Sequence, residues 1–191
     1  MRKELDNLLC TRYPKIFKNR NNTIQNSAMA WGFECGDGWF VLIDQLARCI
    51  EQHVMWQRQQ RARALLYNRR LKKAIKLNDY QILINPKLKN HQYHIEDCKQ
   101  RFYTQEYQEV PELVKWVVCD QVKEKFGTLR FYYHGGDACT DGMVQLAEMM
   151  SATICEQCGN LGKQTTGDYA RTLCDVHLKM LGCVGEYKQN V

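Results

Sequence analysis

The C-terminal third of the chain contains four residues whose types and spacing suit a metal ion. Cys155 and Cys158 are separated by two residues, and so are Cys174 and His177. Zinc binds thiolates and imidazoles tetrahedrally, and a closed set of four protein ligands is typical of a structural site. The sequence therefore predicts one structural zinc ion per chain, held by Cys155, Cys158, Cys174 and His177.

Other interpretations of these residues stay open. A Cys-x-x-Cys pair can be a redox centre, but it then usually accompanies a βαβ pattern, which this sequence does not show. The four side chains could instead contribute only to packing. Cys183 could replace His177 as the fourth ligand, although it lies nine residues after Cys174 rather than within one helical turn. A catalytic zinc would need an open coordination position and a nearby acid or base.

The segments around the four residues predict a small lobe that resembles a treble clef. Gly159 suits the tight turn that lets the first two cysteines approach one ion, because glycine takes positive φ without steric cost. Residues 160–173 predict a hairpin that turns at 166–168, and the second ligand pair then opens a short helix. We expect the zinc to stabilise this lobe by about 10–16 kcal/mol, as in zinc-finger peptides.

The preceding residues predict an α+β fold, with N-terminal helices, a central antiparallel β-hairpin and the zinc lobe at the C-terminus. Apolar residues recur at helical spacing from Ile43 to Val54. Period-two segments at 116–123 and 128–133 flank Gly127 and predict the hairpin. We expect an α+β domain over residues 1–150, with a basic helical insertion at about 58–108, and a zinc-binding lobe over 151–191.

Several local details follow from the same patterns. We expect Asp37, in the Gly-Asp-Gly turn at 36–38, to cap the helix that begins near Trp39. This helix is either continuous to about Lys76 or broken near 57–60. Residues 80–84 predict a short strand, and residues 91–107 predict a helix. A helix capped by Thr140 or Asp141 should end near Ser151 and turn four apolar side chains inward: Met143, Leu146, Ala147 and Met150.

Composition narrows the class of protein. A hydrophobic content of 45% with only three prolines favours a folded globular chain over a disordered one. No apolar run approaches the ~20 residues that cross a bilayer, so no membrane association is expected. The first residues lack the apolar core of a signal peptide. Together with the zinc spacing, this predicts a reducing cytoplasm, where the other six cysteines remain free thiols.

The positive charge is concentrated in one segment. Residues 58–76 contain eight Lys or Arg and no Asp or Glu, so this segment carries a charge of +8. Because the net charge of the whole chain is +6, the remaining residues carry −2. A helix of this kind could follow a phosphate backbone or meet an acidic protein surface. Alternatively, it is a solvated face balanced by Glu106, Glu109 and Glu112. The candidate contact residues are Arg58, Arg61, Arg69, Arg70, Lys72, Lys73 and Lys76.

Two further sets of residues are weaker candidates. Glu34, Asp37 and Asp44 lie close together in the sequence and could hold a divalent metal for a nuclease, although a turn acid, a cap and an exposed helix position explain them as well. A second metal site is conceivable at His91, His94 and Cys98, which share one face of the expected helix. The solvated helix face is the default interpretation of that set.

Three stretches of the chain resemble an uncharacterised family encoded in phages and in bacterial genomes that carry prophages. These are the Gly36-Asp37-Gly38-Trp39 turn, residues 121–132 (QVKEKFGTLRFY) and the Cys155/Cys158/Cys174/His177 set. The resemblance covers roughly residues 31–55 and 116–178. It implies a zinc-binding protein in a cytoplasmic phage setting, and no settled biochemical activity comes with it.

The expected function is therefore that of a non-enzymatic phage accessory protein that binds a host macromolecule. A host protein is the expected partner. The expected role of the binding is to block a host defence or to redirect host machinery. The alternatives are a nucleic-acid-binding regulator that uses the basic helix and, third, a metal-dependent nuclease. No catalytic residue is assigned.

Overall fold

A computed structural model of the chain describes residues 1–166 and 169–180. Helices and strands are mixed, as the α+β prediction requires. The chain forms two compact units, one comprising Met1–Val54 and Val114–Val191 (unit 1) and one comprising Met55–Leu113 (unit 2). The described part of the expected zinc lobe belongs to unit 1, and the expected basic insertion falls within unit 2. No helix in the described residues has the length and hydropathy needed to cross a membrane.

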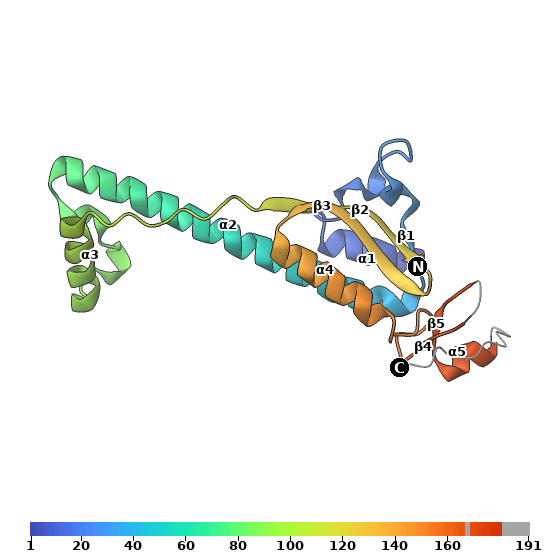
Figure 1. Cartoon of the computed structure of the whole chain (residues 1–191). Coiled ribbons are helices and arrows are strands. Elements are labelled where there is room, and N and C mark those ends of the chain that lie inside the picture. The colour runs from blue at the N-terminus through green and yellow to red at the C-terminus, as the bar shows by residue number, and fades with distance from the viewer. Residues whose placement is uncertain (167–168, 181–191) are drawn as a thin grey trace. The chain divides into compact units, whose positions relative to one another are not determined.

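Unit 1 is built on a three-stranded sheet with the order β1-β2-β3 (Figure 1). β1 (Phe33–Glu34) pairs in parallel with β2 (Lys115–Lys125), and β2 pairs antiparallel with β3 (Thr128–Gly136). Phe126 and Gly127 connect β2 to β3, with φ of 54° and 79°. Positive φ at both residues of a two-residue connection matches the twist of the strands. The predicted hairpin is confirmed.

Three helices bury their apolar faces against this sheet. They are α1 (Lys3–Arg12), the first part of α2 (Phe40–Leu77) and α4 (Ala138–Ser151). On β3, Leu129 and Phe131 are buried, whereas Arg130 between them is half-buried and Tyr132 after them is exposed, which is the alternation of a half-covered strand. The helical residues that complete this core are Leu9, Ile43, Leu46, Ala47, Ile50, Val54, Val144 and Ala147. The helical prediction over 43–54 is confirmed, and α2 is unbroken near 57–60.

The start of α4 differs from the prediction. Asp137 is the capping residue: its carboxylate accepts the Thr140 backbone N–H at 3.0 Å, and the Thr140 hydroxyl lies 3.3 Å from the Asp137 backbone N–H, which donates to it. Neither Thr140 nor Asp141 is therefore the cap. Leu146 and Met150, predicted to be buried, are 58% and 46% exposed. The face that enters the core is rotated toward Val144, because the sheet contacts that side of the helix.

The connection between α1 and the sheet is held by a buried ion pair. This connection contains three short 3₁₀ turns, η1 (Lys18–Asn21), η2 (Ala28–Trp31) and η3 (Asp37–Trp39). The carboxylate of Asp6, only 4% exposed, accepts hydrogen bonds from Arg20 Nε and Nη2 at 2.9 Å. Arg20 Nη1 also donates to the Ala30 carbonyl at 3.1 Å. A single guanidinium therefore joins α1, η1 and η2.

Unit 2 has a small core of its own. The second part of α2 contributes Leu71 and Ala74, which pack with Leu83 and Cys98. Residues 80–84 do not form the predicted strand, because Tyr80–Leu83 is a 3₁₀ turn (η4) whose start is capped by the side chain of Asp79. A second turn, η5 (Pro86–Leu88), leads into α3 (Gln92–Thr104). The predicted helix over 91–107 is confirmed over most of its length.

Candidate functional site

The four predicted zinc ligands come from three neighbouring elements at the end of unit 1. Cys155 and Cys158 lie on a tight loop, closed by a hydrogen bond from the Gly159 N–H to the Cys155 carbonyl at 2.8 Å. The predicted hairpin is the antiparallel pair β4 (Lys163–Gln164) and β5 (Thr172–Leu173). Cys174 follows β5, and His177 is in α5 (Asp175–Met180). Gly167 and Asp168 of the predicted turn lie outside the described residues.

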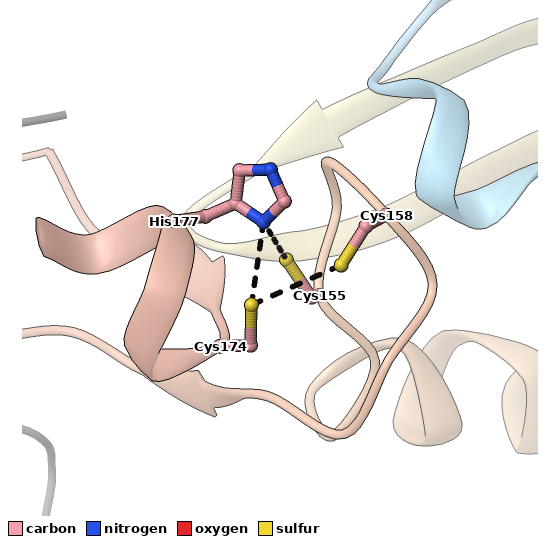
Figure 2. A group of neighbouring side chains, drawn as sticks. All are labelled: Cys155, Cys158, Cys174 and His177. Carbon is pink, nitrogen blue, oxygen red and sulfur yellow. Dashed lines mark hydrogen bonds between the residues drawn. The ribbon is translucent and has the colours of Figure 1, made fainter. Parts of the chain in front are cut away.

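The structure brings the four ligand atoms together, all within 4.8 Å of one another (Figure 2). His177 Nδ1 lies 3.3 Å from Cys174 Sγ and 3.7 Å from Cys155 Sγ. Cys158 Sγ lies 3.8 Å from Cys174 Sγ. Cys183, the alternative fourth ligand, lies outside the described residues.

These separations can be compared with those of a tetrahedral metal site. Metal bonds of about 2.3 Å to sulfur and 2.0–2.1 Å to nitrogen place two sulfurs about 3.8 Å apart, and a sulfur and a nitrogen about 3.5 Å apart. Three of the six separations in this group, 3.8 Å between two sulfurs and 3.3 and 3.7 Å between sulfur and nitrogen, are close to these values, and the other three stay within 4.8 Å. The Cys/His group is therefore sized for one tetrahedral metal ion.

The cysteines of the group differ in acidity. Hydrogen bonds from the backbone N–H and the side chain of His177 lower the pKa of the Cys174 thiol to about 6, whereas hydrogen bonds with Cys155 and Cys174 contribute to a raised pKa of Cys158. The thiolate is the form of cysteine that binds metals, so the shift at Cys174 favours its metal-binding form.

The turn at residues 36–38 lies directly against the cysteine loop, a contact that the sequence patterns do not reveal. The side chain of Glu156 accepts the Gly36 N–H at 2.9 Å, and its backbone carbonyl accepts the Gly38 N–H at 2.7 Å. A Cβ placed on Gly38 would lie 2.2 Å from the Cys155 carbonyl oxygen. The φ of neither glycine is positive, so backbone conformation does not require glycine at these positions. Glycine is needed here because two backbones meet and leave no room for a side chain.

Trp39 and Asp37 in this turn also have structural partners. Trp39 is fully buried, and its Nε1–H donates to the Ile154 carbonyl at 2.8 Å. Asp37 does not cap the following helix, because its carboxylate accepts hydrogen bonds from the Arg2 backbone N–H and from Arg2 Nε, both at 2.7 Å. The turn thus joins the N-terminus to the lobe that carries the Cys/His group, which we call the metal lobe.

The connection between β2 and β3 contacts the other side of the same lobe. The Thr172 hydroxyl donates to the Gly127 carbonyl at 2.5 Å, and the Gln164 side-chain amide donates to the Phe126 carbonyl at 2.9 Å. All three stretches on which the family resemblance rests therefore meet at the metal lobe. The sequence separates them by up to 120 residues, so local patterns could not predict that they touch.

The basic segment of α2 presents a set of free cations within unit 2. Six of its eight Lys and Arg side chains are exposed, and within the described part of the chain these six make no hydrogen bond or ion pair. We call this set the cationic face: Arg63, Arg69, Arg70, Lys72, Lys73 and Lys76. The two other predicted contact residues are half-buried and have partners. Arg61 Nη1 donates to the Pro111 carbonyl, and Arg58 is also engaged.

The glutamates that could have balanced this charge lie beside the helix but do not pair with it. Residues 106–113 form no helix or strand. They run antiparallel to α2, since Tyr67 contacts Glu106 while the earlier Arg61 contacts the later Pro111. The Tyr67 hydroxyl donates to the Glu106 carbonyl at 3.3 Å, and the Asn68 amide donates to the Gln108 carbonyl at 2.8 Å. These contacts use the backbone of the segment rather than its carboxylates. The described residues therefore leave the cationic face without an acidic partner.

Unit 1 also has an apolar groove beside the cysteine loop. It encloses about 530 Å³ and is lined mainly by α2 and α4, with Val41, Leu46, Leu146 and Met150 among its residues, and Cys158 also lines it. Sequence reasoning missed this groove because it placed Leu146 and Met150 in the core.

Neither of the two weaker candidate sets forms a group of three metal ligands in the described residues. The three acids proposed for a nuclease bind different partners: Glu34 accepts from Gln121, Asp37 from Arg2, and Asp44 from Arg12 and Tyr13. His94 Nε2 lies 3.7 Å from Cys98 Sγ but accepts the Asn85 backbone N–H at 3.0 Å, and His91, the residue before α3, does not join them in a group of three metal ligands. Among the described residues, the Cys/His group is the one set of three or more side chains arranged for a metal.

Comparison with known proteins gives no relative for the chain. No protein-family model matches it, and neither a curated protein nor a solved structure matches it significantly.

Proposed function

We propose that this protein is a non-enzymatic accessory protein that binds an acidic surface of another macromolecule through the cationic face of α2. The observation that carries this proposal is that six exposed cations lie within fourteen residues of one helix and lack acidic partners in the described structure. Such an array concentrates positive potential and attracts anionic partners over a distance of about 10 Å at 0.1 M salt.

The cost of this arrangement to folding also supports a binding role. Like charges three or four residues apart on a helix destabilise it by about 0.2–0.5 kcal/mol per pair. Arg69 makes such pairs with Lys72 and Lys73, and Lys76 makes two more with the same residues. The helix dipole favours cations only in the last turn, where Lys76 lies. An anionic partner would remove the remaining repulsion.

The proposal includes zinc as the metal of the Cys/His group. Three thiolates and one imidazole in a tetrahedral arrangement suit zinc, and four protein ligands leave no open position for chemistry. The loop, the β4–β5 hairpin and the ligand-bearing α5 support the treble-clef interpretation of the lobe. Zinc would serve here to hold the lobe against the turn at residues 36–38 and the β2–β3 connection.

The cellular setting comes from the family resemblance alone. On that basis we propose a phage protein in the host cytoplasm whose partner is a host macromolecule, with interference with host defence or host machinery as its biological role. The separate partners of Glu34, Asp37 and Asp44 support a non-enzymatic role over a nuclease.

Affinity capture from host lysate tests the function. Tagged wild-type protein and the Arg69/Arg70/Lys72/Lys73→Ala variant are compared at low and high salt, with and without nuclease treatment. We expect the wild type to capture a partner at low salt, and both the variant and high salt to lose it. Equal capture by the variant would reject the cationic face. A protein retained at high salt would direct attention to an apolar surface such as the groove of unit 1.

Removing one ligand tests the zinc assignment. Cys158→Ser should lose the metal and lower the melting temperature of unit 1. Cys139→Ser is the matched control, because Cys139 is also an exposed free thiol but lies in α4, outside the Cys/His group. Metal content per chain, measured by elemental analysis, should fall only for Cys158→Ser. One retained zinc with unchanged melting would contradict the assignment.

A further inference from the structure

We infer that the acidic surface recognised by the cationic face is the phosphate backbone of duplex nucleic acid, bound without regard to base sequence. This inference rests on the proposed function and names its partner. It follows from the placement of the cations on the helix, from the lack of an exposed apolar side chain between Arg69 and Lys76, and from the engagement of Tyr67 and Asn68, which could otherwise stack on or read a base.

Four of the cations lie on a single face of α2. Arg69, Lys72, Lys73 and Lys76 are spaced i, i+3, i+4 and i+7, which places them side by side on a helix. The buried positions Leu71 and Ala74 lie on the other side, against the core of unit 2. The four cations therefore point away from the protein together, as contact with an extended surface requires.

The linear spacing of these cations matches that of a nucleic-acid strand. With a rise of about 1.5 Å per residue, the seven residue steps from Arg69 to Lys76 span about 10 Å. One strand of duplex DNA carries a phosphate about every 3.4 Å along the axis, so three or four phosphates fall within that length. Four cations can thus neutralise the phosphates that they face, with Arg63 and Arg70 on the adjoining side of the helix.

The composition of this face is less suited to a protein interface. Interface centres are enriched in aromatic residues and depleted of lysine, and a few buried apolar anchors supply most of the affinity. Between Arg69 and Lys76, however, Leu71 and Ala74 are buried in the core of unit 2 and Ile75 is half-buried. Exposed Leu65 and Leu66 lie between Arg63 and Arg69, and exposed Leu77 follows Lys76, so an acidic protein is the competing outcome of the test.

Tyr67 and Asn68, the aromatic and amide side chains of α2 next to the cations, are already engaged. The Tyr67 hydroxyl donates to the Glu106 carbonyl, and its ring lies 5.8 Å from the Arg101 guanidinium. The Asn68 amide donates to the Gln108 carbonyl, and its side-chain oxygen accepts the Gln108 N–H, both at 2.8 Å. Single-strand binding relies on aromatic stacking. Sequence-specific readout relies on free amide or guanidinium groups that reach the base edges. Tyr67 and Asn68 are therefore not available for these roles, and the change of duplex sequence in the test below separates phosphate contacts from guanine readout by the free arginines.

Fluorescence anisotropy with a labelled 20-base-pair DNA duplex tests the inference. Four neutralised phosphates predict a slope of about −3.6 for the logarithm of the association constant against the logarithm of salt concentration. Affinity should therefore fall about 150-fold between 50 and 200 mM salt. Changing the duplex sequence should leave the affinity unchanged.

Two double variants, each removing two positive charges, distinguish binding through the cationic face from attraction by net charge alone. Lys72→Ala with Lys73→Ala should reduce the magnitude of the slope by about two, because each lost phosphate contact lowers it by about one. Lys87→Ala with Lys89→Ala removes two exposed lysines of unit 2 that lie outside α2 and should leave the slope unchanged. Alanine is a good helix former, so the first pair should keep α2 folded, and circular dichroism checks this.

A poly-glutamate peptide of matched charge distinguishes failure of the inference from failure of the proposed function. Binding of poly-glutamate as tightly as the duplex would overturn the assignment to nucleic acid while leaving an acidic partner in place. Binding of neither probe at 50 mM salt would overturn both. An equal loss of slope in the two double variants would show attraction by net charge alone and would also overturn the inference.

Discussion

Replacing Gly38 by alanine tests whether the turn at residues 36–38 is locked against the metal lobe. A Cβ at this position would lie 2.2 Å from the Cys155 carbonyl oxygen, 2.4 Å from the Gly159 nitrogen and 2.7 Å from the Cys158 nitrogen. All three atoms belong to the backbone of the cysteine loop, so no flexible side chain can move aside. The loop or the turn must shift instead.

The magnitude follows from two contributions. Overpacking a well-filled site costs about 1–3 kcal/mol. A shift large enough to admit the methyl group also disrupts the hydrogen bond from the Gly38 N–H to the Glu156 carbonyl, now 2.7 Å long, which is worth about 1 kcal/mol. We therefore expect Gly38→Ala to lower the free energy of unfolding by about 2–4 kcal/mol. Because Cys155 and Cys158 move with the loop, the metal should also be released more readily.

Gly142→Ala is the matched control. Gly142 lies within α4, and a Cβ there would meet nothing within 4 Å. Alanine is favoured over glycine inside a helix by about 0.5–1 kcal/mol, so this variant should be slightly more stable than the wild type. Denaturant unfolding of the metal-loaded proteins and the rate of metal loss to a chelator supply the measurements. Equal stability and equal metal retention in the two variants would refute the proposed docking of the turn.

Three further predictions concern the interior of each unit. Partial burial alone would raise the pKa of Asp137, but hydrogen bonds from His53 and Thr140 outweigh it and lower that pKa below its usual value. The stabilisation from Asp137 should be present above about pH 4 and lost as pH falls through the lowered pKa, so Asp137→Asn and wild type should converge in unfolding free energy in acid. Asp6→Ala leaves the half-buried Arg20 without a carboxylate partner, although it keeps the Ala30 carbonyl, and should cost about 3 kcal/mol, the lower end for a broken buried pair, measured by denaturant unfolding. Leu71→Ala empties part of the small core of unit 2 and should cost about 2–5 kcal/mol, measured by hydrogen exchange in α3; an effect below 1 kcal/mol in either variant would contradict its reasoning.

The sequence by itself determined the features that depend on local spacing. The intervals between Cys155 and Cys158 and between Cys174 and His177 limit how the chain can present its ligands, and the structure brings those four side chains together. The β2–β3 hairpin was equally predictable, because period-two segments on both sides of Gly127 leave few other solutions. The cationic character of α2 also follows directly from its composition.

Tertiary structure decided the features that depend on which face of an element meets which neighbour. The apolar residues of α4 fit more than one inward face, and only contact with the sheet selects Val144 over Leu146. The glutamates after α3 could have neutralised the basic helix, but the chain passes α2 in an extended form that contacts it through backbone carbonyls. The contact of Gly36 and Gly38 with Glu156 joins residues more than 100 positions apart. No local periodicity encodes such contacts, because they arise from the way already formed elements pack together.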